Sequence, residues 1–137
     1  MISPAIHFPG NCAEAIAFYQ KAFNAEVSFI DYYHNALSGS GIHVTEKTKN
    51  FVMHSELKIC GTSVNMSDAI EEIEPGNMFK LNVFLNSADD VCSAFNLLKE
   101  GGKIAVELGP QFFSPMYAGI IDRFGIHWQL ITAGGVK

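Results

Sequence analysis

The sequence has little cysteine, no long apolar run and no run of basic residues. Its three cysteines, Cys12, Cys60 and Cys92, are odd in number and lack the spacing of a metal-binding motif. That usage is typical of a reducing compartment, so we expect the cytoplasm. No stretch approaches the roughly 18 consecutive apolar residues that indicate a membrane span. The first residues also lack the basic and apolar regions of a secretion signal.

The charge balance argues against nucleic acid as a partner. Nine Lys and Arg stand against 14 Asp and Glu, a net charge of −5, and no basic cluster is present. Apolar residues, by contrast, make up 48% of the 137 residues and include 11 Phe. This composition is sufficient for a core, in one domain or in two small halves that share it.

The two halves of the chain resemble each other at two different offsets. Ala94-Phe95 lies 77 positions after Ala17-Phe18, and Gly125 lies 64 positions after Gly61. The difference of 13 assigns additional residues to the first half, where the polar, Gly/Ser-rich residues 34–50 predict a mobile loop. A duplicated unit normally builds one site between its copies, so the repeat indicates where to look for function.

Hydrophobic periodicity predicts the order β-α-β-β-β in each half. Asn11 is expected to cap the first helix with Glu14, and Asn24 to end it in a left-handed conformation. The predicted segments of the first half are a strand at 4–8, a helix at 12–23, a strand at 26–33, and a hairpin of 51–58 and 62–67 around Cys60-Gly61. Those of the second half are a strand at 80–86, a helix at 88–100 capped by Ser87, a strand at 103–108, a Pro-containing loop at 109–115, and a hairpin of 117–122 and 126–132. The fold class is therefore α+β, with βαβββ modules at about residues 1–68 and 79–137 and an acidic linker at about 69–78.

Alternation along the strands assigns one face of each sheet to its helix and leaves the other face open. The residues expected on the open faces are polar or aromatic: His7, His54, Glu56, Asn65, Asn82, Phe84, His127 and Gln129. Such a face is either the lining of a cleft or a sheet surface that meets water. The pattern alone favours neither interpretation.

A series of short motifs runs through the whole chain. It comprises Gly10-Asn11-Cys12-x-Glu14-Ala15-Ile16-x-Phe18-Tyr19, Met53-His54-Ser55-Glu56-Leu57-x-Ile59-x-Gly61, Ser67-Asp68 and Gly119-x-x-x-Asp122-x-Phe124-Gly125-x-x-Trp128. The series resembles the PhnB-like family of the glyoxalase/bleomycin-resistance/dioxygenase (vicinal oxygen chelate) superfamily. The resemblance implies two βαβββ modules whose strands form an open, U-shaped mixed-sheet barrel around a small-molecule cleft, usually in a homodimer.

Some members of the PhnB-like family carry a 3-demethylubiquinone methyltransferase label. The chain has no Gly-rich turn after a first strand followed by an acidic ribose-binding residue. We therefore expect no S-adenosylmethionine as a cofactor.

The resemblance also implies where a divalent metal would bind, because superfamily enzymes hold one with His, Glu or Gln from the first and last strands of each module. The corresponding positions here are Pro4 or Ala5, Asn65, Asn82 and Gln129. Pro and Ala offer no side-chain ligand, and neutral amides are weak ligands compared with imidazole or carboxylate. We expect no metal at the inherited site, although His7, His54, Glu56 and His127 form an alternative, displaced set.

Several residues are candidates for chemistry or ligand contact. His54 and Glu56 are the best acid/base pair, with a solvated or salt-bridged strand Glu as the alternative. Cys12 stands in the first turn of a helix, where the dipole lowers a thiol pKa, or it is a small buried side chain. Tyr117 and the aromatic loop 111–116 would either close over an apolar ligand or pack at a dimer interface.

Three functions remain open from the sequence. The first is a PhnB-like protein that binds a small molecule between its modules without the usual metal, its specific activity unknown. The second is a divalent-metal-dependent lyase, isomerase or dioxygenase with displaced ligands. The third is a drug-sequestering protein of the bleomycin-resistance type.

Overall fold

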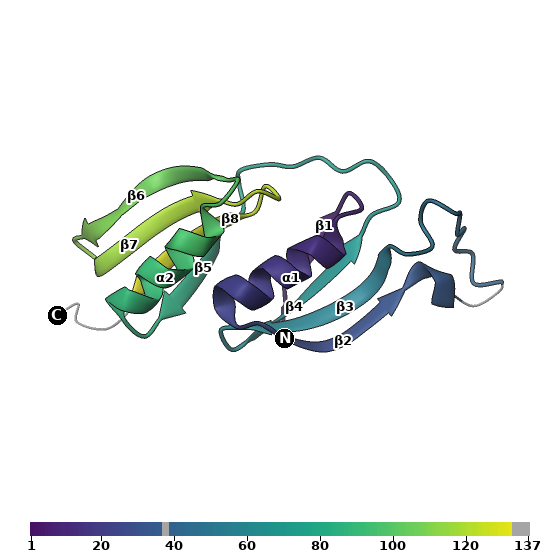
Figure 1. The fold of residues 1–137 in the computed structure, drawn as a ribbon, viewed down its shortest axis with the longest axis horizontal. Helices are drawn as coiled ribbons and strands as arrows, with labels where there is room; N and C mark the ends of the chain where they lie inside the picture. Colours follow the sequence, from purple (N-terminus) through teal and green to yellow (C-terminus); the bar gives the residue numbers. More distant parts are fainter. Residues whose placement is uncertain (37–38, 133–137) are drawn as a thin grey trace. The chain divides into compact units, whose positions relative to one another are not determined.

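The computed structural model describes residues 1–36 and 39–132, which form two compact units that divide between Glu74 and Pro75. The elements of the first unit are β1 (Ala5–Phe8), α1 (Cys12–Phe23), β2 (Glu26–Tyr32), the short 3-10 helix η1 (Tyr33–Asn35), β3 (Val52–Ile59) and β4 (Thr62–Asp68) (Figure 1). Those of the second unit are β5 (Leu81–Leu85), α2 (Ala88–Leu98), β6 (Lys103–Gln111), β7 (Ser114–Ile121) and β8 (His127–Thr132). The predicted α+β class with tandem βαβββ modules is confirmed. The structure defines each unit by itself, so a U-shaped barrel made from both stays a prediction.

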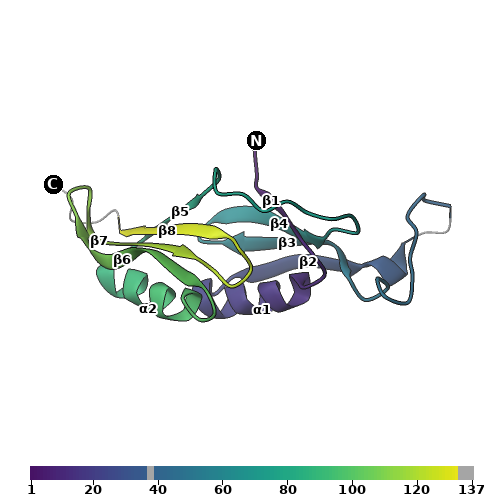
Figure 2. The same cartoon turned by 90° about the horizontal axis from the view of Figure 1, so that it is seen from above.

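The first unit is a four-stranded mixed sheet with one helix on one face. The strand order is β1-β4-β3-β2, in which β1 pairs with β4 in parallel and the other pairs are antiparallel. Helix α1 lies against this sheet, mainly over β3 and β4 (Figure 2). Its buried residues are Cys12, Ala15, Ile16, Phe18 and Tyr19, at the helical spacing that the sequence predicted. The opposite face of the sheet is left open.

The second unit repeats this arrangement with the strand order β5-β8-β7-β6. Helix α2 buries Val91, Ala94, Phe95 and Leu98 against β7 and β8. The side chain of Ser87 accepts a hydrogen bond of 3.1 Å from the Asp90 amide, which confirms the predicted cap. The buried and exposed residues of β5 alternate as predicted, with Val83 buried and Phe84 exposed.

Strand register shows that the internal repeat is structural. In the parallel pair of the first unit, Ala5 lies opposite Asn65, and in that of the second unit Asn82 lies opposite Gln129. Residue 82 is 77 positions after residue 5, and residue 129 is 64 positions after residue 65. The pair β1–β4 therefore corresponds to the pair β5–β8, with the offset of 77 on the first strand and of 64 on the second. The additional residues of the first half lie between β2 and β3.

The predicted side-chain cap of α1 by Asn11 is wrong. Asn11 makes no side-chain capping hydrogen bond, and its side-chain oxygen is buried without a partner. Instead the carboxylate of Asp68, at the end of β4, accepts hydrogen bonds from the amides of Gly10 (3.0 Å) and Cys12 (2.9 Å). Its second oxygen accepts from the Val52 amide at 2.9 Å. A residue far along the chain therefore caps the helix and anchors the start of β3.

The predicted Pro-containing loop at 109–115 is also wrong. Strands β6 and β7 extend to Gln111 and from Ser114, so only Phe112 and Phe113 form the turn. Pro110 is tolerated because β6 is the edge strand, where an amide hydrogen is not needed on the outer side. Register shifts on both sides of Gly109 accommodate the irregular backbone.

The segment between β2 and β3 contains local structure in its described part. Besides η1, a turn is closed by hydrogen bonds from the amides of Thr48 and Lys49 to the carbonyl of Thr45. Part of the predicted mobile loop, residues 37–38, lies outside the described residues. Within the described part of the chain, no helix has the length and hydrophobicity to cross a membrane.

Candidate functional site

A row of four side chains crosses the open face of the first sheet. Strand pairing places Ala5 beside Asn65, Asn65 beside Glu56, and Glu56 beside Phe29. The Glu56 carboxylate accepts a hydrogen bond of 2.7 Å from the Ser63 hydroxyl, two residues before Asn65 on β4. Polar groups from β3 and β4 thus meet at the centre of this face.

The predicted acid/base pair, His54 and Glu56, lies on one face of β3 because the two residues are separated by one position. The ring of His54 contacts Phe29, with 5.6 Å between centroids, whereas Glu56 is bonded to Ser63. The two side chains therefore share a surface but have different immediate partners. His7 lies on β1 opposite Ser67, on the same open face.

The sequence interpretation missed two residues on β2, Phe29 and Asp31. Asp31 pairs with His54 across the strands. Its carboxylate accepts hydrogen bonds from the Asn35 amide group (2.7 Å) and the Tyr32 amide (2.9 Å). These bonds, with lesser contributions from His34 and His54, lower the pKa of Asp31 below its ordinary value. Alternation along residues 26–33 was the signal that could have placed both residues on this face.

The open face of the second sheet has an equivalent row of four residues, but their side chains differ in chemical type from those of the first sheet. Asn82 pairs with Gln129, Gln129 with Gly119, and Gly119 with Val106. Gly119 stands where the first unit has Glu56, and a Cβ atom there would lie 3.2 Å from the Val106 side chain. The row therefore offers two neutral amides beside a close-packed apolar segment, and no ionised group.

Aromatic residues flank these amides. Phe84 is 62% exposed and pairs with Ile131, which pairs in turn with Tyr117. Tyr117 is buried, and the Phe113 ring packs edge-on against it with 5.0 Å between centroids. Burial raises the pKa of Tyr117 above its ordinary value. The loop expected to close over a ligand is thus a two-residue turn whose Phe113 already packs against the sheet.

His127 begins β8 and pairs with Ile121. It is partly exposed and stands two positions from Gln129 on the same strand face. It belongs to the second unit, so its meeting with His7, His54 and Glu56 of the first stays a prediction.

The residues at the inherited metal positions do not fit a divalent ion. Strand pairing brings the expected positions together, Ala5 with Asn65 and Asn82 with Gln129, and the backbone N–H of Asn65 donates to the Pro4 carbonyl at 2.9 Å. None of these residues supplies the imidazole or carboxylate that a catalytic divalent ion requires. Across residues 1–36 and 39–132, no three His, Cys, Asp or Glu side chains gather in a way that could hold a metal.

Other motif residues support the backbone. The buried Asp122 carboxylate accepts hydrogen bonds from the amides of Phe124 (2.9 Å) and Ile126 (3.1 Å) and from the Trp128 indole (2.8 Å). Cys12 is buried, and burial together with the nearby Asp68 carboxylate raises its pKa to about 12. Of the two interpretations of Cys12, the structure supports the small buried side chain, because desolvation and a negative neighbour both disfavour the thiolate.

Comparison with known proteins covers nearly the whole chain. A sequence profile described as the glyoxalase/bleomycin resistance protein/dioxygenase superfamily matches residues 3–130. YjdN of Escherichia coli (strain K12) is 27% identical over 139 residues, which span 94% of this chain and 92% of YjdN.

Solved structures show the same architecture. PA1353 from Pseudomonas aeruginosa has a TM-score of 0.82 and 25% identity over 96% of both chains. A Bacillus cereus protein, described as a putative 3-demethylubiquinone-9 3-methyltransferase, PhnB protein, has a TM-score of 0.80 and 24% identity over 96% of this chain and 98% of its own. The fosfomycin resistance protein FosX from Listeria monocytogenes has a TM-score of 0.67 and 11% identity, over 96% of this chain and 91% of FosX. At these identities the latter two show the fold alone.

Proposed function

Because the chain belongs to the glyoxalase/bleomycin resistance protein/dioxygenase superfamily, we propose that it is a PhnB-like protein that binds a small organic molecule on the open faces of its sheets, without the superfamily's metal. The ligand has an aromatic or apolar part and a polar group that an amide can recognise. The single observation that supports this most strongly is the pairing of Asn82 with Gln129 beside the exposed Phe84.

The chemistry of that surface defines the ligand class. An exposed Phe ring is a platform for stacking, and aromatic pairs contribute about 0.5–1.5 kcal/mol beyond the burial of area. The side chains of Asn82 and Gln129 each supply both donors and an acceptor, so they recognise a carbonyl, hydroxyl or amide equally well. A few oriented polar groups among apolar ones are typical of small-molecule sites.

The first sheet provides the groups for any proton transfer. Glu56 is held by the Ser63 hydroxyl, and the Phe29 ring lies against His54. These contacts fix both side chains on the face, as a general acid or base requires. We assign His54 and Glu56 to this role, and His7, Asn65, Tyr117 and His127 to ligand contact.

Assembly and compartment complete the proposal. We expect a homodimer, as is usual in the superfamily. We also expect the protein to work in a reducing cytoplasm, because Cys12, Cys60 and Cys92 are all free.

A ligand screen with matched variants tests the binding surface. Aromatic amides and phenols are screened by thermal shift, and hits are mapped by backbone amide chemical shifts. Phe84→Ala should weaken a hit roughly three- to tenfold through lost stacking, and the double variant Asn82→Ala/Gln129→Ala should also weaken it. Phe79→Ala, at a residue that is 87% exposed and outside both sheets, is the control. Hits that map elsewhere, or that bind both site variants as tightly as wild type, would refute this surface.

Metal content tests the other half of the proposal. Protein purified without chelator should carry Zn, Mn, Ni and Fe far below one ion per chain by elemental analysis. A stoichiometric metal that disappears in His54→Ala would contradict the metal-free proposal and favour displaced ligands.

A further inference from the structure

The first unit contains a pocket that is separate from the open sheet face. It has a volume of about 380 Å³ and lies beside the segment that leaves β4. Its apolar lining comes from Pro9, Phe51, Ala69, Ile70 and Ile73, and all of its lining residues belong to the first unit. This volume falls within the range of about 300–1,000 Å³ that is usual for small-molecule sites.

The base of the pocket is held by the connections of β1, β3 and β4. Gly10 has a positive φ of 106°, and its backbone lies so close to Phe51 that a Cβ atom would be 2.8 Å from the ring. The Ala69 amide donates to the Phe8 carbonyl at 2.7 Å. The Asp68 carboxylate ties both neighbouring segments together. The apolar floor is therefore pre-formed.

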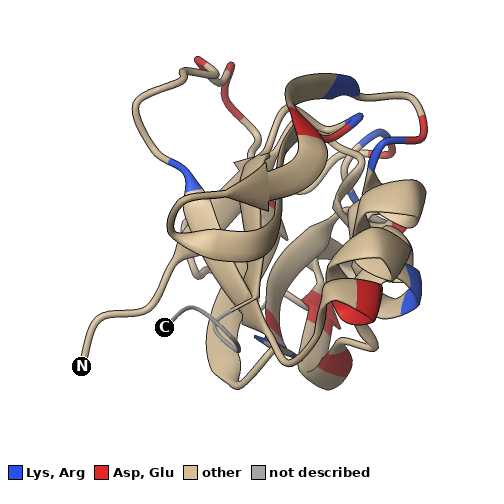
Figure 3. Cartoon of the chain, turned by 90° about the vertical axis from the view of Figure 1, so that its left-hand side faces the viewer, with Lys and Arg blue, Asp and Glu red and all other residues tan. Residues whose placement is uncertain are grey.

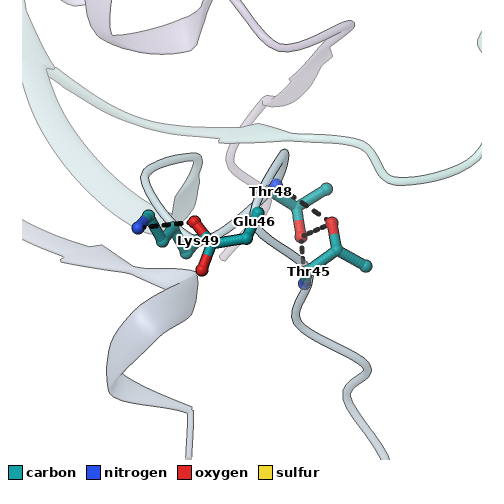
Figure 4. Close-up of polar contacts among 4 residues, drawn as sticks. All are labelled: Thr45, Glu46, Thr48 and Lys49. Atoms are coloured by element: carbon teal, nitrogen blue, oxygen red, sulfur yellow. Dashed lines mark hydrogen bonds and ion pairs between the residues drawn. The ribbon is translucent and has the colours of Figure 1, made fainter.

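One wall of the pocket is a hydrogen-bonded turn, shown in Figure 4. Thr48 lines the pocket and is only 8% exposed. Its hydroxyl lies 3.2 Å from that of Thr45 and accepts from the Thr45 amide at 3.0 Å. An ion pair of 2.8 Å between Lys49 and Glu46 braces the same turn. This wall exists only because of the additional residues between β2 and β3; the second unit has a two-residue turn at the equivalent place.

The charge at the rim is negative. Glu71 and Glu72 line the pocket from the acidic segment between β4 and β5, which carries red residues in Figure 3. Among the described residues that line it, Lys47 is the one cation. Within the described residues, neither carboxylate forms an ion pair. Burial, Asp68 and Glu71 together raise the pKa of Tyr33, whose hydroxyl donates to the Asp68 carbonyl at 3.1 Å. The field around this pocket therefore favours a positive group.

We propose that this pocket binds an organic cation, with an ammonium group at Glu71 and Glu72 and an apolar body against Phe51, Ile70 and Ile73. The apolar floor supplies non-directional burial, and the two carboxylates select the sign of charge. Lys47 lies at the rim as a like charge and weakens the attraction without cancelling it. The site is independent of the sheet faces and of the function proposed for them.

Three probes of equal chain length separate the contributions of charge and apolar area. Octyltrimethylammonium, octyl sulfate and octanol are each titrated into the full-length protein by calorimetry, below their micellar concentrations. We expect the cation to bind most tightly, to shift the backbone amides of Thr48 and Ile70, and to weaken as salt rises. Binding of the sulfate as tightly as the cation, or no binding by any probe, overturns the proposal.

Charge variants localise the effect. Glu71→Gln/Glu72→Gln should weaken the cation roughly three- to tenfold, as two exposed ion pairs predict. Lys47→Gln should strengthen it roughly twofold. Glu74→Gln removes one carboxylate charge at a residue outside the pocket lining and should leave binding unchanged, as should Phe84→Ala on the other unit. A loss per charge removed that is as large in Glu74→Gln as in the pocket variant would mean a general charge effect and would refute the site.

Discussion

Asp68 holds three segments of the first unit together, and its replacement by Asn is the sharpest test of the fold. Asp68 is 2% exposed, and its carboxylate accepts from the backbone amides of Gly10, Cys12 and Val52 at 2.9–3.0 Å. Asn has nearly the same shape but only one acceptor oxygen. If that oxygen serves Gly10 and Cys12, the new NH₂ group faces the Val52 amide, so that two donors oppose each other.

The expected cost follows from these bonds. A buried donor left without a partner costs about 1–3 kcal/mol, and loss of the charge weakens each remaining bond by about 1 kcal/mol. The negative charge at the start of α1 contributes roughly another 0.3–1 kcal/mol. Burying a neutral amide is cheaper than burying a carboxylate, which offsets part of the sum. We expect Asp68→Asn to lower the free energy of unfolding by about 2–4 kcal/mol.

Urea denaturation followed by far-UV circular dichroism measures this difference. Asp89→Asn is the control, because it makes the same charge change at an exposed position in the first turn of α2 and should cost at most about 0.5 kcal/mol. Hydrogen exchange should show that the Cys12 and Val52 amides lose protection in Asp68→Asn. A loss of stability no larger than that of Asp89→Asn, with both amides still protected, would refute the role assigned to Asp68.

Two further predictions concern packing and thiol reactivity. Gly102→Ala should destabilise the second unit by about 1–3 kcal/mol in the same urea assay, because the new Cβ would overlap the backbone oxygen of Ile121. Gly109→Ala is the control, since its Cβ meets nothing within 4 Å. Equal costs of the two substitutions would contradict this packing. With a thiol reagent at pH 8, Cys60 should react in the native protein because it is exposed, although desolvation raises its pKa as well. Buried Cys12, whose pKa is raised to about 12, should react only on unfolding. Mass spectrometry of the labelled peptides measures the order, and early labelling of Cys12 would show that its segment opens readily.

Local chemistry made much of the fold predictable from the sequence. Alternation placed Val83 in the core and Phe84 outside it, and Gly61 adopts the positive φ of 88° that the predicted turn requires. Asn24 ends α1 in the left-handed conformation that was expected. Each of these features depends on a residue and its near neighbours, so the pattern carries the information.

The candidate site was predictable only as a set of faces. Alternation gave each strand its outward residues, but which of them are neighbours depends on register, and a bulge displaces it between Asp31 and Tyr32. Asp31 beside His54 therefore emerged only from the structure. The same limit applies to Glu56, whose partner Ser63 is reached across the hairpin.

The two repeated helices are capped by different kinds of interaction. Ser87 caps α2 from the adjacent position, a local interaction that its sequence indicates. Asp68 caps α1 from the far end of β4. The equivalent position in β8 is Thr132, whose amide instead donates to the Ser114 hydroxyl at 3.3 Å, joining β8 to β7 without involving a helix. The cap that Asp68 provides to α1 thus forms only with the first sheet, whereas α2 carries its own cap. Duplication preserved the register of the strands but not the means by which each helix is fixed to them.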